Sequence, residues 1–145
     1  MTKRLYYDDP YLLDFEAEVL DRFNSGDGRQ HIILDKTAFY PTSGGQPYDT
    51  GVLEDQRVLT CFEDESGNVV HEVEGAVVGK RVRGFVDRDR RIDHIQQHSG
   101  QHVLSRACLE LFGWPTIGFH MGSAVSTIDI GVESASQEKI KSIEE

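Results

Sequence analysis

The sequence predicts an α+β protein in which a β-barrel of about residues 1–90 precedes a mixed α/β region over residues 91–145. Two observations indicate this order. Short stretches of alternating or β-branched residues, separated by glycine-rich turns, fill the first part, as they do in small barrels. From residue 91 onward the apolar residues recur at steps of three and four, which is the spacing of an amphipathic helix.

The first expected strand lies at Phe15–Val19, where apolar residues alternate with Glu16 and Glu18. Phe15, Val19 and Phe23 also fit one helical stripe, so a helix remains an alternative here. A turn is predicted at residues 24–28, after which residues 31–34 return as a hairpin strand. Further short strands are expected at residues 51–54, 58–63, 69–73 and 81–86.

A helix is predicted from Ile92 to Phe112, and Gly113 and Pro115 are the residues expected to end it. Strands at residues 116–121 and 124–130 follow, with a turn between them. A second helix is expected from Ser136, the predicted N-cap, to Glu145. Because a natural domain rarely ends inside a helix, we expect the chain to be truncated.

Composition is that of a folded globular chain, with 38% hydrophobic and 28% charged residues. No run of about 18 apolar residues and no apolar signal core occur, so we expect a cytoplasmic protein. The cysteines, Cys61 and Cys108, lie far apart and form no CxxC pair, and we expect them to be reduced and buried.

The net charge of −10 opposes indiscriminate binding to nucleic acid. One stretch, Lys80–Arg91, differs because it holds six basic residues against two aspartates. Such a patch can bind a phosphate backbone, and the alternative is a solvated strand and turn balanced by neighbouring acids. The sequence alone leaves both interpretations open.

Histidines recur every four residues along the predicted helix, at His94, His98 and His102. Neighbours in this series lie one turn apart on one face, so the imidazoles of an adjacent pair can reach one metal ion. All three cannot do so easily, because the outer pair is about 12 Å apart along the axis. The spacing permits either pair, and a polar helix face with ordinary histidines is the alternative.

Three segments in series carry a resemblance to a known family. The stretch from Asp93 to His102 resembles the HxxxH region of AlaX proteins and of alanyl-tRNA synthetase editing domains. The stretch Thr37–Pro47 resembles the glycine-rich GGQ segment of the barrel that precedes this helix in longer AlaX forms. Residues 116–122, with Thr127–Asp129, are similar to the strands that follow it. The resemblance thus implies a barrel followed by the first part of an editing domain.

The resemblance implies a Zn²⁺ site in which His98 and His102 are ligands, with His94 in a structural or outer-sphere role. In the family a CxxxH motif further along the chain supplies the other ligands, and this sequence contains no such motif. It also implies that Ser99 recognises a serine side chain and that His120 lies near the substrate. A hydroxyl at Ser99 makes physical sense, because a pocket that hydrogen-bonds a hydroxyl rejects the analogue without one.

The implied activity is hydrolysis of the ester in tRNA(Ala) mischarged with serine or glycine, with Zn²⁺ either activating water or positioning the amino acid. We expect tRNA contacts at Gly44, Gly45 and Gln46 of the glycine-rich segment. A plain structural turn is the alternative there. Further tRNA contacts are expected at Arg88, Arg90 and Arg91. A competing hypothesis is a non-catalytic module of the same fold that binds RNA or a protein partner.

Overall fold

The computed structural model describes residues 1–144 and divides into two compact units. The first unit comprises Met1–Ser43 with Pro47–Ile92, and the second comprises Gly44–Gln46 with the chain from Asp93 onward. The predicted boundary lay between residues 90 and 91 and assigned the glycine-rich segment to the barrel. In the structure, Gly44–Gln46 pack with the second unit instead. Each unit is described separately below.

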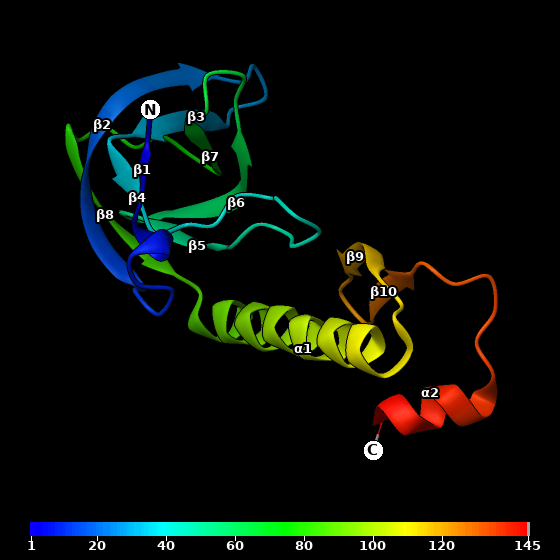
Figure 1. Ribbon diagram of the computed structural model, residues 1–145. Coiled ribbons are helices and arrows are strands. Elements are labelled where there is room, and N and C mark those ends of the chain that lie inside the picture. Colours follow the sequence, from blue (N-terminus) through cyan, green and yellow to red (C-terminus); the bar gives the residue numbers. More distant parts are fainter. Residues whose placement is uncertain (145) are drawn as a thin grey trace. The chain divides into compact units, whose positions relative to one another are not determined.

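The first unit is a closed six-stranded barrel, which confirms the predicted fold class. Its strands follow the order β2-β3-β7-β6-β5-β8 around the barrel, and their neighbours are antiparallel (Figure 1). They are β2 (Asp14–Asn24), β3 (Gln30–Leu34), β5 (Gly51–Leu53), β6 (Gln56–Glu63), β7 (Val69–Val73) and β8 (Arg81–Val86).

Strand β2 decides between the two interpretations of the first apolar stretch. Phe15 and Ala17 are buried in the barrel core, whereas Glu16 and Glu18 are exposed, as the alternation requires. Phe23, which a helical stripe would bury beside Phe15, remains 46% exposed. Burial of one face of a long strand therefore overrides the helical spacing.

The barrel interior also holds a buried polar group. The His71 ring on β7 is fully buried, with its Nδ1 atom 3.1 Å from the Ile32 carbonyl oxygen and its Nε2 atom 2.8 Å from the Thr37 hydroxyl. Thr37 belongs to the short strand β4 (Lys36–Thr37), which pairs in parallel with β1 (Lys3–Arg4). These bonds satisfy both ring nitrogens, so the polar ring is accommodated in an apolar core. A 3₁₀ turn, η1 (Leu5–Tyr7), follows β1.

Helix α1 (Arg88–Phe112) begins before the predicted start at Ile92. Asp87 caps it, because its Oδ1 atom accepts the backbone N–H groups of Asp89 at 3.1 Å and Arg90 at 3.4 Å. The end is as predicted: Gly113 adopts φ +68° and donates its N–H to the Leu109 carbonyl oxygen. The first turn of the helix thus belongs to the barrel unit.

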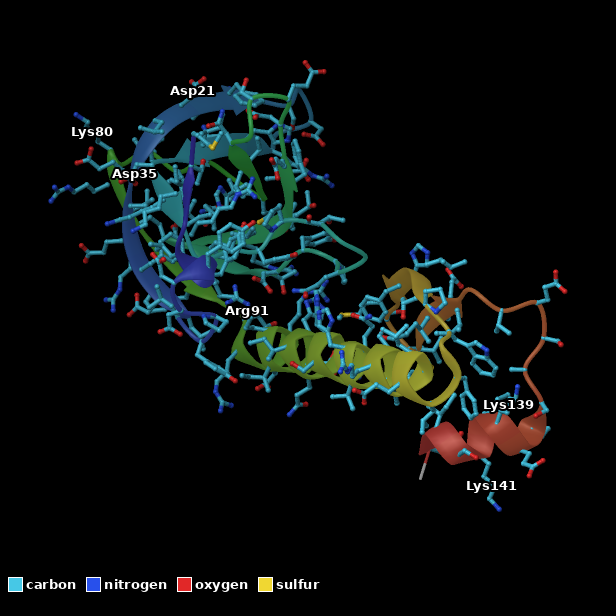
Figure 2. The ribbon with its side chains drawn as sticks, viewed as in Figure 1. Asp21, Asp35, Lys80, Arg91, Lys139 and Lys141 are labelled. Carbon is cyan, nitrogen blue, oxygen red and sulfur yellow. The ribbon has the colours of Figure 1, made fainter. Side chains whose placement is uncertain are left out.

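The second unit contains the rest of α1, the hairpin of β9 (Thr116–Met121) and β10 (Ser126–Ile130), and helix α2 (Gln137–Glu144) (Figure 1). The predicted cap of α2 is confirmed, because the Ser136 hydroxyl accepts the backbone N–H of Lys139 at 3.4 Å. The ammonium group of Lys139, which is labelled in Figure 2, lies 5.3 Å from the centroid of the Trp114 ring. Across residues 1–144, no helix is long and apolar enough to span a membrane.

Candidate metal-binding site on helix α1

The second unit carries His98 and His102 on successive turns of α1. Their ring centroids lie 4.9 Å apart and their planes are inclined by 35°. His98 is half-buried and His102 is exposed, so the pair lies at the surface and is not enclosed in apolar packing. Two imidazoles this close on one helix face can donate nitrogen lone pairs to one ion.

Gln46 determines which ring nitrogen of His98 carries the proton. Its side-chain oxygen Oε1 lies 2.9 Å from Nδ1 of His98. Because an amide oxygen only accepts, Nδ1 carries the proton and Nε2 keeps its lone pair. Burial lowers the pKa of His98 below its ordinary value, and the neighbouring His102 lowers it further. The neutral imidazole that a metal ion requires is therefore favoured.

The backbone of the glycine-rich segment is bonded to β9. The Gly45 carbonyl oxygen accepts the N–H of Met121 at 2.8 Å. A Cβ atom at Gly45 would lie 2.1 Å from the Phe119 carbonyl oxygen, and the residue has φ +81°. At Gly44, φ is +57° but no atom lies within 4 Å of the Cβ position. Gly45 is thus required both for its conformation and for close approach to β9.

A surface hollow of about 400 Å³ lies beside the second histidine, with Ser105 and Thr116 among its lining residues. The Thr116 hydroxyl donates to Ser105 Oγ at 2.8 Å, and the Gln101 amide donates to the same Ser105 oxygen at 2.7 Å. The hydroxyl groups beside His102 were not singled out from the sequence. Ser105 is three residues after His102 and therefore on the same helix face, which was the available signal.

Ser99 and His120 are placed differently from the histidine pair. Ser99 is exposed on α1, and His120 is exposed on β9 with its Nε2 atom 3.8 Å from Asp129 Oδ2. Within the described part of the chain, neither side chain forms a hydrogen bond with His98 or His102. Their assigned roles in substrate recognition therefore stay predictions.

The donor set tests whether zinc fits this chain. His98 and His102 provide two suitable nitrogen donors, and one of them already has its outer nitrogen bonded, as is usual for histidines that bind metals. Among residues 1–144, no group of three or more His, Cys, Asp or Glu side chains is arranged to hold an ion. His94 and Cys108 are both buried. The residues present therefore fit half of a zinc site.

The three arginines predicted to contact RNA differ in accessibility. The Arg88 side chain is 73% exposed and lies 3.7 Å from the carboxylate of Asp89, which is exposed as well. Arg90 is half-buried, donates from Nε to the Tyr48 carbonyl oxygen at 2.9 Å, and stacks over the Tyr48 ring. Arg91, which is labelled in Figure 2, is buried. It pairs with Asp49 and donates to the Pro10 carbonyl oxygen at 2.7 Å. Its guanidinium is not presented to a phosphate, and its role is to attach the first turn of α1 to the barrel.

The rest of the basic stretch is partly neutralised within the barrel unit. Arg81 pairs with Glu18 at 3.4 Å, and Arg83 pairs with Asp14. Lys80 is exposed and projects away from the barrel (Figure 2). Exposed positive charge without an acidic partner is therefore sparser here than the sequence indicated.

The chain is similar to known proteins over almost its whole length. The family described as tRNA synthetases class II (A) matches residues 5–90. The chain is 40% identical to the alanine–tRNA ligase of Pyrococcus abyssi over 99% of its own length and 16% of the ligase. It is 36% identical to the alanyl-tRNA editing protein AlaX-M of Methanosarcina mazei and 38% identical to AlaX-M of Pyrococcus horikoshii, covering 99% and 90% of its own length. It spans 61% of each of these AlaX-M proteins.

Proposed function

Because this chain belongs to the class II tRNA synthetase (A) family, and its curated relatives include alanyl-tRNA editing proteins, we propose that it is an aminoacyl-tRNA deacylase. The substrate would be tRNA(Ala) mischarged with serine or glycine, and the reaction hydrolysis of the ester. The observation that carries the proposal is the His98–His102 pair, whose rings lie 4.9 Å apart on one face of α1.

The pair would hold Zn²⁺ together with ligands from outside the described residues. When bound, zinc supplies a Lewis acid for the ester carbonyl group or lowers the pKa of a bound water. The chain's own contribution is twofold: partial burial favours the neutral form of His98, and the Gln46 bond favours the tautomer with the proton on Nδ1 and a free lone pair on Nε2. His102 and the adjacent Ser105 and Thr116 hydroxyls border a hollow that can receive a small polar group.

Selectivity for the seryl ester is assigned to hydroxyl groups on this surface. Ser99 is exposed one residue after His98 and is available to hydrogen-bond the substrate hydroxyl. A site that satisfies such a hydroxyl disfavours the alanyl ester, which leaves the site's polar groups unpaired. His120, also exposed, is the second candidate for contact with the ester or the terminal adenosine.

RNA contact is assigned to Arg88, with Arg90 as a partly engaged second cation. Arg91 is left out of this set because its guanidinium is buried against Asp49. Of the glycine-rich segment, Gly44 has open space around its Cβ position and remains a candidate for backbone contact. Gly45 and Gln46 already bond to Met121 and His98.

Deacylation assays test the proposal. Purified protein is incubated with Ser-tRNA(Ala), Gly-tRNA(Ala) and correctly charged Ala-tRNA(Ala), with and without added Zn²⁺. We expect hydrolysis of a mischarged species and its loss in His98→Ala and His102→Ala. His31→Ala is the matched control, because His31 lies on β3 in the barrel unit. Equal hydrolysis by wild type and both metal-pair variants would exclude the metal-dependent reaction.

A measurement of tRNA(Ala) binding distinguishes the non-catalytic alternative from the deacylase. If the wild type hydrolyses none of the esters but binds tRNA(Ala), the chain is an RNA-binding module. In that case replacing Arg88 and Arg90 with glutamine lowers the salt dependence of binding, by roughly one counterion for each phosphate that the protein no longer neutralises.

A further inference from the structure

We propose that Gln46 is a positioning residue for the metal ligand His98, and that the glycine-rich segment belongs to the metal centre. This inference rests on the proposed function, since it concerns the same site. It assigns to Gln46 a task other than RNA contact: holding one tautomer and one ring orientation of His98.

The side chains of Gln46 and His98 are joined by a hydrogen bond. Gln46 is 7% exposed, and its Oε1 atom lies 2.9 Å from His98 Nδ1. A neutral imidazole has a single N–H, and an amide oxygen has only lone pairs to offer. The hydrogen bond therefore requires the Nδ1–H tautomer, which leaves the Nε2 lone pair free to bind a metal ion.

The backbone explains why the glutamine stands at this place. The Gly45 carbonyl oxygen accepts the Met121 N–H at 2.8 Å, which adds the segment to the side of β9. The same strand carries Phe119, whose ring centroid lies 6.0 Å from that of His98. Strand β9 thus holds both the segment that bears Gln46 and an aromatic side chain beside the imidazole.

Gly45 makes this placement possible. An added Cβ atom would lie 2.1 Å from the Phe119 carbonyl oxygen, so any side chain at this position forces the segment away from β9. Gly44 provides a matched comparison: it also has positive φ, but no atom lies within 4 Å of its Cβ position. Alanine at Gly44 strains the backbone only, whereas alanine at Gly45 also displaces Gln46.

The first experiment reads the tautomer directly in the metal-free full chain. Long-range ¹H–¹⁵N NMR spectra distinguish a protonated Nδ1 from a protonated Nε2 in an assigned histidine. We expect His98 to be protonated at Nδ1 in the wild type and in Gln46→Glu, which retains an oxygen acceptor. In Gln46→Met, which keeps the chain length but has no such acceptor, we expect a mixture of tautomers.

The second experiment measures Zn²⁺ affinity by titration of the same proteins. Loss of an outer-sphere partner of a metal-binding histidine typically weakens binding by about 10–100-fold. We expect that loss in Gln46→Met and in Gly45→Ala, and near wild-type affinity in Gln46→Glu and Gly44→Ala. Protonated Nε2 in wild-type His98, or unchanged tautomer and affinity in Gln46→Met, would overturn the inference.

The outcome of the tautomer and affinity measurements does not depend on the outcome of the deacylation assay. If Gln46→Met changes the tautomer while the wild type hydrolyses no ester, the positioning role holds and the proposed function fails. If Gln46→Met does not fold, the wild-type tautomer and the comparison of Gly44→Ala with Gly45→Ala still decide the inference.

Discussion

Replacing His71 with glutamine measures how strongly one buried imidazole makes the barrel unit sensitive to acid. The ring is fully buried, with its nitrogens bonded to Ile32 and Thr37. Burial lowers the pKa of His71 from 6.5 to about 4, against the smaller opposing effect of the bond to the Ile32 carbonyl oxygen. The unfolded chain keeps the ordinary value, so the two states take up this proton at different pH.

The sign and size follow from proton linkage. Above pH 6.5 the imidazole is neutral in both states and adds no pH dependence. As pH falls from 6.5 towards 4, the unfolded state binds a proton that the folded state excludes, so the free energy of unfolding decreases. A difference of about 2.5 pKa units at 1.36 kcal/mol each gives a loss of about 3 kcal/mol across this window.

Urea unfolding at a series of pH values provides the measurement. All five tyrosines lie in the barrel unit and Trp114 lies in the second unit, so tyrosine fluorescence follows the barrel. We expect the acid-dependent loss of stability in the wild type to be largely absent in His71→Gln. His31→Gln, a substitution on the neighbouring strand β3 at a ring that is 17% exposed, should retain it.

Three aspartates with lowered pKa values affect stability mainly below this pH window. The pKa values of Asp14, Asp27 and Asp64 are lowered from 3.8 by hydrogen bonds, so the stability they contribute is lost only at more acidic pH. A wild-type barrel whose stability is flat between pH 6.5 and 4, or an equal slope in His71→Gln, would refute the reasoning.

The remaining predictions concern attachment, capping and RNA contact. Arg91→Met leaves Asp49 buried without its ion pair and should destabilise the barrel unit by about 3–5 kcal/mol in urea unfolding, whereas adding Asp49→Leu should restore part of the loss. Ser136→Ala removes the cap of α2 and should weaken that helix by about 1 kcal/mol, seen as faster amide exchange at Lys139. Arg88→Gln should lower the salt dependence of tRNA binding with no change in barrel stability.

Each of these has a result that contradicts it. An Arg91→Met barrel as stable as wild type would show that the buried pair does not attach the helix. Unchanged exchange at Lys139 would mean that packing, and not the cap, maintains the start of α2. Identical salt dependence in Arg88→Gln and wild type would mean that Arg88 is only solvated surface.

Much of the fold follows from local patterns. Alternation predicted β2, and a spacing of three and four residues predicted most of α1, because burial of one face imposes these periods. The first turn of α1 escaped prediction since Arg88–Arg91 contains no apolar residue to mark a face, although Asp87 offered a cap. Strands of two residues, such as β1 and β4, are too short to display a period.

The candidate site was only partly predictable. Helical spacing predicts that adjacent histidines of α1 share one face, and the family resemblance selects His98 and His102 from the two possible pairs. The structure places these two rings close together, while metal binding stays a prediction. The bond from Gln46 to His98 joins residues 52 positions apart. No spacing rule encodes such a pairing, because the path of the chain between them determines it. The burial of Arg91 likewise depends on a distant partner, Asp49.

The placement of Gly44–Gln46 in the second unit has a consequence for dissecting the protein. A fragment that starts at Asp93 retains the imidazole pair but lacks the amide that bonds to His98. A fragment that ends at Ile92 retains that amide without its imidazole. A cut at the boundary between Ile92 and Asp93 therefore separates the amide from its imidazole, and a fragment that keeps both has to begin at or before Gln46 and include part of the barrel sequence.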